Sequence, residues 1–299
     1  MRPRSWHSAL LLLASTILLA ACSGPGTGGP IAHPSGDGLI FRISTQGGFV
    51  GPGVLFTSFP GFSLLGDGRV IVPGAQIEIY PGPALPAVNT RRVNEAGIQA
   101  ILQEILKSGV FSTNAEYRGA QNVVADAPDT IFSLQAEGRQ VTILVYGLGT
   151  LPEGNTQAGI SAEELATHAA LLHLSERLMN LDAWLPASGW ADPDWTPFQP
   201  DALRLLVRNA DADQPDGSGI SNQLVPWPTA YDPATFGAPT GTVSEARCGV
   251  VTGPDAGTWY RALASANQLT RFTQAGHRYE VSVRFMLPDE APTCPDRGI

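Results

Sequence analysis

The spacing of apolar residues in the first half of the chain predicts both strands and helices. Alternating positions predict short strands at residues 39–44 and 77–80. Residues 62–72 and 130–146 each predict a β-hairpin, with turns at Asp67-Gly68 and Glu137-Gly138. An acidic residue followed by glycine favours such a turn, because both central positions need positive φ angles.

Two segments carry a helical period. The first covers residues 95–108, where Asn94 is expected to cap the start and Gly109 to follow the end. Ser161 and Glu164 form a capping box that predicts a second helix, running to about residue 180. We expect this helix to turn four leucines toward the core: Leu165, Leu172, Leu174 and Leu178. The first domain is therefore predicted as one antiparallel sheet with two helices packed on it.

Residues 187–200 break every apolar period with Pro, Gly and Asp, so they are predicted to be a linker. The pattern beyond them predicts strands at 203–208 and 247–251, a long loop at 209–244, a helix at 254–266 and a third hairpin within 269–287. The order helix then hairpin occurs in both halves, which makes them candidates for distant copies of one unit. The predicted fold is α+β, with an N-terminal domain at 39–186 and a C-terminal domain at 201–299.

The N-terminus has the pattern of an export signal. Arg2 and Arg4 precede an apolar run that is too short to span a membrane. The sequence Leu19-Ala20-Ala21-Cys22 resembles the lipobox of bacterial lipoproteins. That resemblance implies a signal peptide at 1–21 and acylation of Cys22 with palmitate-type chains. The glycines and prolines of residues 22–38 predict a flexible tether. The alternative is an ordinary cleaved signal with an incidental cysteine.

Composition and charge narrow the class of protein. Hydrophobic residues make up 43% of the chain and charged residues 15%, which favours folded domains over disorder. The net charge is −9, and loss of the signal would remove Arg2 and Arg4 but no acid, so the mature chain would carry −11. Nucleic acid is therefore not an expected partner, because phosphate binding requires a basic surface.

Three cysteines fit a lipoprotein in an oxidising compartment. If Cys22 carries lipid, Cys248 and Cys294 remain as a pair for a disulfide. Closing that loop would stabilise the fold by about 4 kcal/mol in the chain-entropy model. The alternative is two unpaired thiols.

Several short segments extend the resemblance to secreted and lipid-anchored bacterial proteins of uncharacterised function. They are Gly47-Gly48-Phe49, Gly66-Asp67-Gly68-Arg69-Val70, Asp126-Ala127-Pro128-Asp129-Thr130, and Leu287-Pro288-Asp289-Glu290 followed by Cys294. The resemblance implies an extracytoplasmic α+β fold and brings no catalytic residues with it. By similarity to Gram-negative lipoproteins, Ser23 after the lipidated cysteine permits delivery to the outer membrane.

The histidines and acids do not form a convincing catalytic or metal site. His168 and His173 lie five apart on a helix, so they cannot face one metal, and we expect them on its surface. His277 opens a strand in phase with inward residues and is expected to be half-buried. Residues 211–217 alternate acids as a calcium loop does, but Pro215 breaks the ligand pattern, so a solvated turn is favoured.

Tryptophans gather at the predicted linker and in the long loop: Trp184, Trp190, Trp195 and Trp227. Aromatic residues in loops can form a stacking face for sugar rings or for a partner. We regard Trp190, Trp195 and Trp227 as candidate ligand-stacking residues. The alternative, which the sequence favours, is that they fill the joint between two domains.

These observations predict a membrane-anchored, extracytoplasmic binding or interaction module without enzymatic activity, cofactor or metal. Its expected partners are membrane lipid through Cys22 and a protein or carbohydrate of the cell envelope. The alternative is an extracytoplasmic hydrolase whose site assembles only in the fold, with His277 as its base. An envelope scaffold without a small ligand is a third hypothesis that the sequence does not separate from the first.

Overall fold

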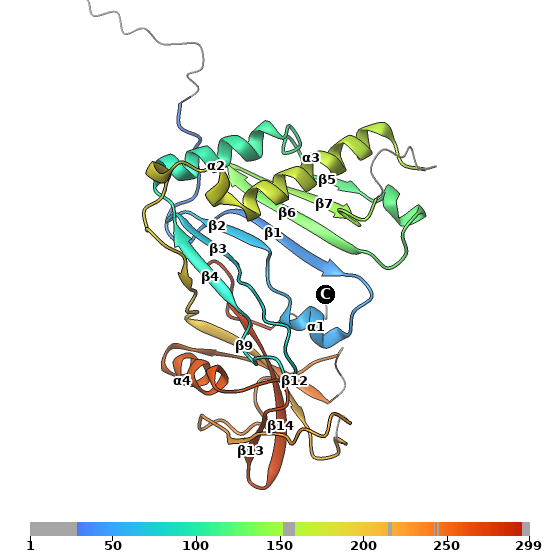
Figure 1. The fold of residues 1–299 in the computed structure, drawn as a ribbon, viewed down its shortest axis with the longest axis vertical. Helices are drawn as coiled ribbons and strands as arrows, with labels where there is room; N and C mark the ends of the chain where they lie inside the picture. The colour runs from blue at the N-terminus through green and yellow to red at the C-terminus, as the bar shows by residue number, and fades with distance from the viewer. Residues whose placement is uncertain (1–28, 152–158, 215–216, 242, 244, 295–299) are drawn as a thin grey trace, which may run out of the picture. The chain divides into compact units, whose positions relative to one another are not determined.

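The chain builds two β-sheets and packs helices on each, which confirms the predicted α+β fold class (Figure 1). The structure is a computed structural model that describes residues 29–151, 159–214, 217–241, 243 and 245–294. Within it, Ile31–Ile299 forms one compact unit. The first sheet has eight strands and the second has six. None of the helices in the described residues is long and apolar enough to cross a membrane.

The first sheet has the strand order β5-β7-β6-β1-β2-β3-β4-β8. Its strands are β1 Leu39–Gly47, β2 Phe62–Leu65, β3 Arg69–Pro73, β4 Val88–Arg92, β5 Ala115–Tyr117, β6 Pro128–Ala136, β7 Arg139–Tyr146 and β8 Thr196–Pro197. Both hairpins predicted for this half are present as β2–β3 and β6–β7. Gly68 has φ +84°, and a Cβ built there would lie 2.1 Å from the carbonyl oxygen of Val93, so the first turn requires glycine.

One predicted strand of this domain is wrong. Residues 77–80 form no strand, and the side chain of Ile77 is 62% exposed. The strand in this region is β4, which pairs with β3. Its sequence, VNTRR, has no apolar alternation, because Val88 is its only apolar residue and polar side chains occupy both faces, and this explains why the pattern missed it.

Helices α2 (Glu95–Lys107) and α3 (Ala162–Met179) cover one face of the first sheet (Figure 1). Both predicted N-caps are confirmed: Asn94 accepts a hydrogen bond from the backbone N–H of Gly97, and Ser161 accepts one from Glu164. The capping box also predicts that the Glu164 carboxylate accepts from the backbone N–H of Ser161. This part is wrong, since the Glu164 carboxylate accepts from the backbone N–H of Gly119 at 2.6 Å instead. This bond ties α3 to the 3-10 turn η1 (Gly119–Asn122).

The inward face of α3 differs from the prediction. The residues that it buries are His168, Leu171, Leu174 and Leu178. Leu172, which was expected inside, is 37% exposed because it lies about 100° around the helix from Leu171. The four predicted leucines do not lie on one stripe of the helix, so they could not all face the core.

The second sheet has the order β10-β13-β14-β9-β12-β11 and carries α4 (Gly253–Ala264). Its strands are β9 Ala202–Asn209, β10 Leu224–Pro226, β11 Ala238–Pro239, β12 Ala246–Thr252, β13 Arg271–Gln274 and β14 His277–Phe285. The third hairpin is confirmed as β13–β14, and its inward residues Tyr279, Val283 and Phe285 are buried. The predicted long loop at 209–244 contains the short edge strands β10 and β11.

Strands β2 and β3 contribute to two hydrophobic cores. Leu64 and Val70 face the helices of the first sheet. Their neighbours Leu65 and Ile71 point the other way, into the core of the second sheet around Trp259. Because successive side chains of a strand alternate between faces, these two strands connect both cores and are buried on each side.

The predicted tether and the predicted linker are both partly folded. In the tether, the backbone N–H of Ile31 donates to Gln99 Oε1 at 2.8 Å, and the N–H of Glu137 donates to the Ala32 carbonyl at 2.7 Å. In the linker, η3 (Ala187–Gly189) packs on the start of α2, and β8 pairs with β4 of the first sheet. Polar side chains and backbone pairing hold these segments, and neither leaves an apolar pattern in the sequence. Cys22 and the signal lie outside the described residues.

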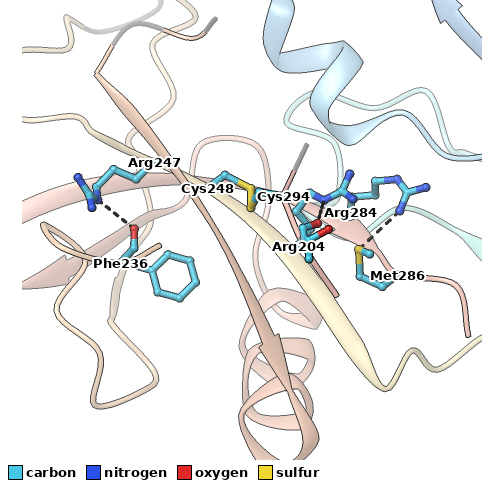
Figure 2. The surroundings of a disulfide bond; sticks show 8 residues. Arg204, Phe236, Arg247, Cys248, Arg284, Met286 and Cys294 are labelled. Carbon is cyan, nitrogen blue, oxygen red and sulfur yellow. Dashed lines mark hydrogen bonds between the residues drawn. A yellow bond between two sulfur atoms is a disulfide. The ribbon is translucent and has the colours of Figure 1, made fainter. Parts of the chain in front are cut away.

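The chain's C-terminal segment is fastened to both sheets. The disulfide Cys248–Cys294, with a Cα–Cα distance of 6.0 Å, confirms the expected pairing (Figure 2). Glu290 accepts two hydrogen bonds from Arg284 of β14 at 2.6 and 2.7 Å, while Arg42 of β1 donates to Asp289 at 2.6 Å. Burial alone would raise the pKa of Glu290, but its hydrogen bonds and ion pair with Arg284 outweigh burial and hold that pKa below its usual value.

Candidate functional site

The strongest candidate site is a pocket of about 570 Å³ on the first sheet, beside β4. Arg91 comes from β4, Asp182 from the 3-10 turn η2 (Leu181–Ala183), and Trp190 and Asp192 from the segment that follows η3. A volume of this size lies within the range of small-molecule sites, roughly 300–1,000 Å³. The pocket is therefore formed by segments that lie far apart in the sequence.

Asn94 positions the segment that carries Trp190. Its side-chain oxygen caps α2, while its side-chain amide donates to the Ser188 carbonyl at 2.7 Å and its backbone N–H to the Gly189 carbonyl at 3.0 Å. Val93 and Trp190 then form an isolated antiparallel bridge. The wall of the pocket is thus fixed by the start of α2.

Close approach of this segment to α2 requires glycine at position 97. A Cβ built on Gly97 would lie 2.2 Å from the Gly189 carbonyl oxygen. No Cβ atom tolerates that distance without movement of the backbone, because the obstacle is main chain. Gly97 therefore determines where η3, and with it Trp190, can lie.

Trp190 and Arg91 line the pocket, and Trp195, which is not among the lining residues, packs on Trp190. The rings of Trp190 and Trp195 meet edge to face, with centroids 5.7 Å apart. The guanidinium carbon of Arg91 lies 3.8 Å from the centre of the Trp190 ring, a cation–π contact. Trp190 is only partly buried, so its ring retains surface for a ligand in the pocket.

The polar groups of the pocket are held by each other. Arg91 Nη1 donates to Asp182 Oδ1 at 2.7 Å, and Trp195 Nε1 donates to Asp182 Oδ2 at 2.8 Å. Arg91 Nε donates to the Asp192 carbonyl at 3.1 Å, and Asp192 Oδ2 accepts from the Arg92 backbone at 3.1 Å. These bonds leave part of the acceptor capacity of each carboxylate free for a ligand, since an ionised carboxylate has about four acceptor sites.

Trp227 does not belong to this site. Its side chain is 8% exposed, lies in the second core and packs edge to face on Trp259 at 4.7 Å. Trp184 packs on the first core, stacks with Arg177 and is not among the pocket residues. Of the candidate stacking residues, the structure brings together only Trp190 and Trp195, and it adds Arg91 and Asp182, which no sequence pattern had indicated.

His168 is a core residue and not a surface one. It is buried, and neither of its ring nitrogens has a hydrogen-bond partner in the described part of the chain, although Glu164 Oε1 lies 3.9 Å from Nε2. Burial lowers the pKa of His168, which favours the neutral ring. His173 is exposed, so the two histidines point in different directions. Among the described residues, no group of three or more His, Cys, Asp or Glu side chains could hold a metal ion.

His277 is also placed differently from the prediction. Its side chain is 58% exposed, because it lies at the tip of the β13–β14 hairpin, and its Nδ1 lies 2.7 Å from Asp211 Oδ2. The hydrogen bond with His277 lowers the pKa of Asp211 to about 2. Asp213 pairs with Arg208 at 2.7 Å. Asp211 and Asp213 of the suspected calcium loop are therefore engaged by His277 and Arg208, and Asp216 lies outside the described residues.

No known protein family, curated protein sequence or solved structure matches this chain. Its function is therefore inferred from the chemistry of the pocket. Aromatic faces beside carboxylates and a guanidinium suit a ligand that has both apolar C–H faces and hydroxyl groups.

The role of Gly97 can be tested against a second helical glycine. Gly97→Ala is expected to lower the free energy of unfolding by about 1–3 kcal/mol, because the new methyl group collides with the Gly189 carbonyl. In the control, Gly257→Ala in α4, the nearest atom is Arg261 Nη1 at 3.5 Å, so this variant should gain about 0.4–1 kcal/mol. Urea unfolding followed by circular dichroism measures both. Equal stabilisation of the two variants would contradict the packing of η3 on α2.

Proposed function

We propose that the protein is a lipid-anchored, extracytoplasmic binding module without enzymatic activity, and that its pocket beside β4 binds a saccharide. The signal pattern that ends at Cys22 supports the anchor. The Cys248–Cys294 disulfide supports an oxidising compartment, because such bonds persist outside the cytosol. The expected partners are membrane lipid at Cys22 and a glycan of the cell envelope.

The observation that carries the ligand class is the contact of Trp195 and Arg91 with the same carboxylate, Asp182. A saccharide presents hydroxyl groups that can donate to Asp182 and Asp192, and C–H faces that can pack on the ring of Trp190. The pocket carries two carboxylates and one guanidinium among these groups, which disfavours anionic sugars. We therefore expect a neutral or amino-bearing sugar.

The hydrolase remains the second candidate. Its support is the contact between His277 and Asp211, since a carboxylate on one ring nitrogen orients a histidine for general-base catalysis. The pair is largely exposed, whereas general bases usually act in a cleft that excludes water. The saccharide-binding module is therefore the better supported of the two proposed functions.

The saccharide pocket is tested by replacing its central ring. Trp190→Ala should weaken binding of chito- or cello-oligosaccharides at least tenfold, since the ring forms the apolar wall. Trp184→Ala is the matched control, because Trp184 is a partly buried tryptophan outside the pocket. Calorimetric titration measures the dissociation constants, and circular dichroism checks that both variants fold. Equal affinity of Trp190→Ala and wild type, or no binding of neutral and amino sugars to wild type, would contradict the proposal.

The anchor is tested separately in the full chain. We expect radiolabelled palmitate to enter the wild-type protein and the Cys248→Ser/Cys294→Ser variant, since neither disulfide cysteine is the proposed acylation site. The Cys22→Ser variant should carry no label and should leave the membrane fraction. Labelling of Cys22→Ser, or its retention on membranes, would overturn the anchor without affecting the saccharide site.

A further inference from the structure

A second cleft, of about 340 Å³, lies along strand β14. Its lining includes residues 280–283 of β14, the loop residues 83–86, and Asn267, Gln268 and Thr270. These elements belong to the compact unit Ile31–Ile299 but lie outside the pocket beside β4. The cleft is therefore a separate candidate site.

The strand that borders this cleft is paired on one side only. On one edge, β14 pairs with β9 from Tyr279 to Phe285. On the other edge, β13 pairs only with residues 277–279. From Glu280 onward, this second edge has no strand partner in the described part of the chain. Because successive residues of a strand direct their N–H and C=O groups to alternate edges, two of residues 280–283 present theirs toward the cleft.

The opposite wall of the cleft is fixed by its own hydrogen bonds. The backbone N–H of Gln268 donates to the Gly82 carbonyl at 2.9 Å, and the N–H of Gly82 donates to Gln268 Oε1 at 3.1 Å. The N–H of Ala84 donates to the Ala266 carbonyl at 3.1 Å. Thr270 Oγ1 accepts a hydrogen bond from the backbone N–H of Asn267 at 2.9 Å, which fixes the turn just before β13 begins. The space beside β14 is thus built into the fold.

The side chains along the edge alternate in character. Val281 and Val283 belong to the face that packs in the second core, whereas Glu280 and Ser282 lie on the opposite face. Glu280 forms an ion pair with Arg208 on the neighbouring strand. An added strand would therefore place apolar side chains beside the valines and polar or basic side chains beside Glu280 and Ser282. The net charge of −9 also favours a basic partner.

We propose that this cleft binds an extended peptide segment of a partner protein, which adds to the second sheet as a strand beside residues 280–283. Main-chain hydrogen bonds supply the affinity, and the alternation of apolar with polar or basic side chains supplies the selectivity. Four residues of a strand span about 13 Å, so the contact takes a peptide core of about four residues.

The experiment uses capped hexapeptides that alternate valine with threonine, serine or lysine. Binding to the wild-type protein is measured by fluorescence polarisation, and hydrogen exchange locates the contact. We expect at least one peptide of this set to bind and to slow exchange of the two amides among residues 280–283 that point into the cleft, with no change at the amides of β9, which are already paired.

N-methylation distinguishes strand addition from other modes of binding. An added edge strand uses only every second peptide amide, so methylation of one alternating set should weaken binding at least tenfold, and methylation of the other set should change it less than threefold. Equal effects of the two sets, protection outside residues 280–283, or no binding by any peptide of the set would overturn the proposal. None of these outcomes depends on saccharide binding at Trp190.

Discussion

The fold depends on the burial of β2 and β3 between two cores. Leu64 and Val70 stabilise the first sheet beneath its helices, while Leu65 and Ile71 complete the core around Trp259. The Arg42–Asp289 ion pair fastens the C-terminal segment to β1 of the first sheet, while the Arg284–Glu290 ion pair and the Cys248–Cys294 disulfide fasten it to β14 and β12 of the second. Loss of contacts on either face of these strands would therefore affect both sheets.

The two candidate sites lie where this packing ends. β4 continues the first sheet beyond β3, and its outer edge receives the segment of η3 and β8, which brings Trp190 and Trp195 to Arg91. On the second sheet, β13 separates from β14 near Thr270 and leaves an open strand edge. In both places a rigid sheet positions loop residues, an arrangement typical of binding sites.

The sequence predicted the elements that carry strong local signals. The Asp67-Gly68 and Glu137-Gly138 turns and the caps at Asn94 and Ser161 are formed as expected. Short edge strands such as β8, β10 and β11 were missed because two or three residues cannot show an alternation. The pocket could be predicted only in part, since Trp190 stands out in composition, whereas Arg91 and Asp182 meet it only through long-range pairing. Trp227 was misplaced because burial of a single tryptophan leaves no periodic pattern.

The shared core is tested most directly by native-state hydrogen exchange on an Ile71→Ala variant. Ile71 is fully buried in the second core, so its truncation should lower the free energy of unfolding by about 2–5 kcal/mol. If the two sheets unfold together, the most protected amides of β6 in the first sheet and β9 in the second should lose protection by the same amount. Loss of protection in β9 alone, with β6 unchanged, would contradict this account.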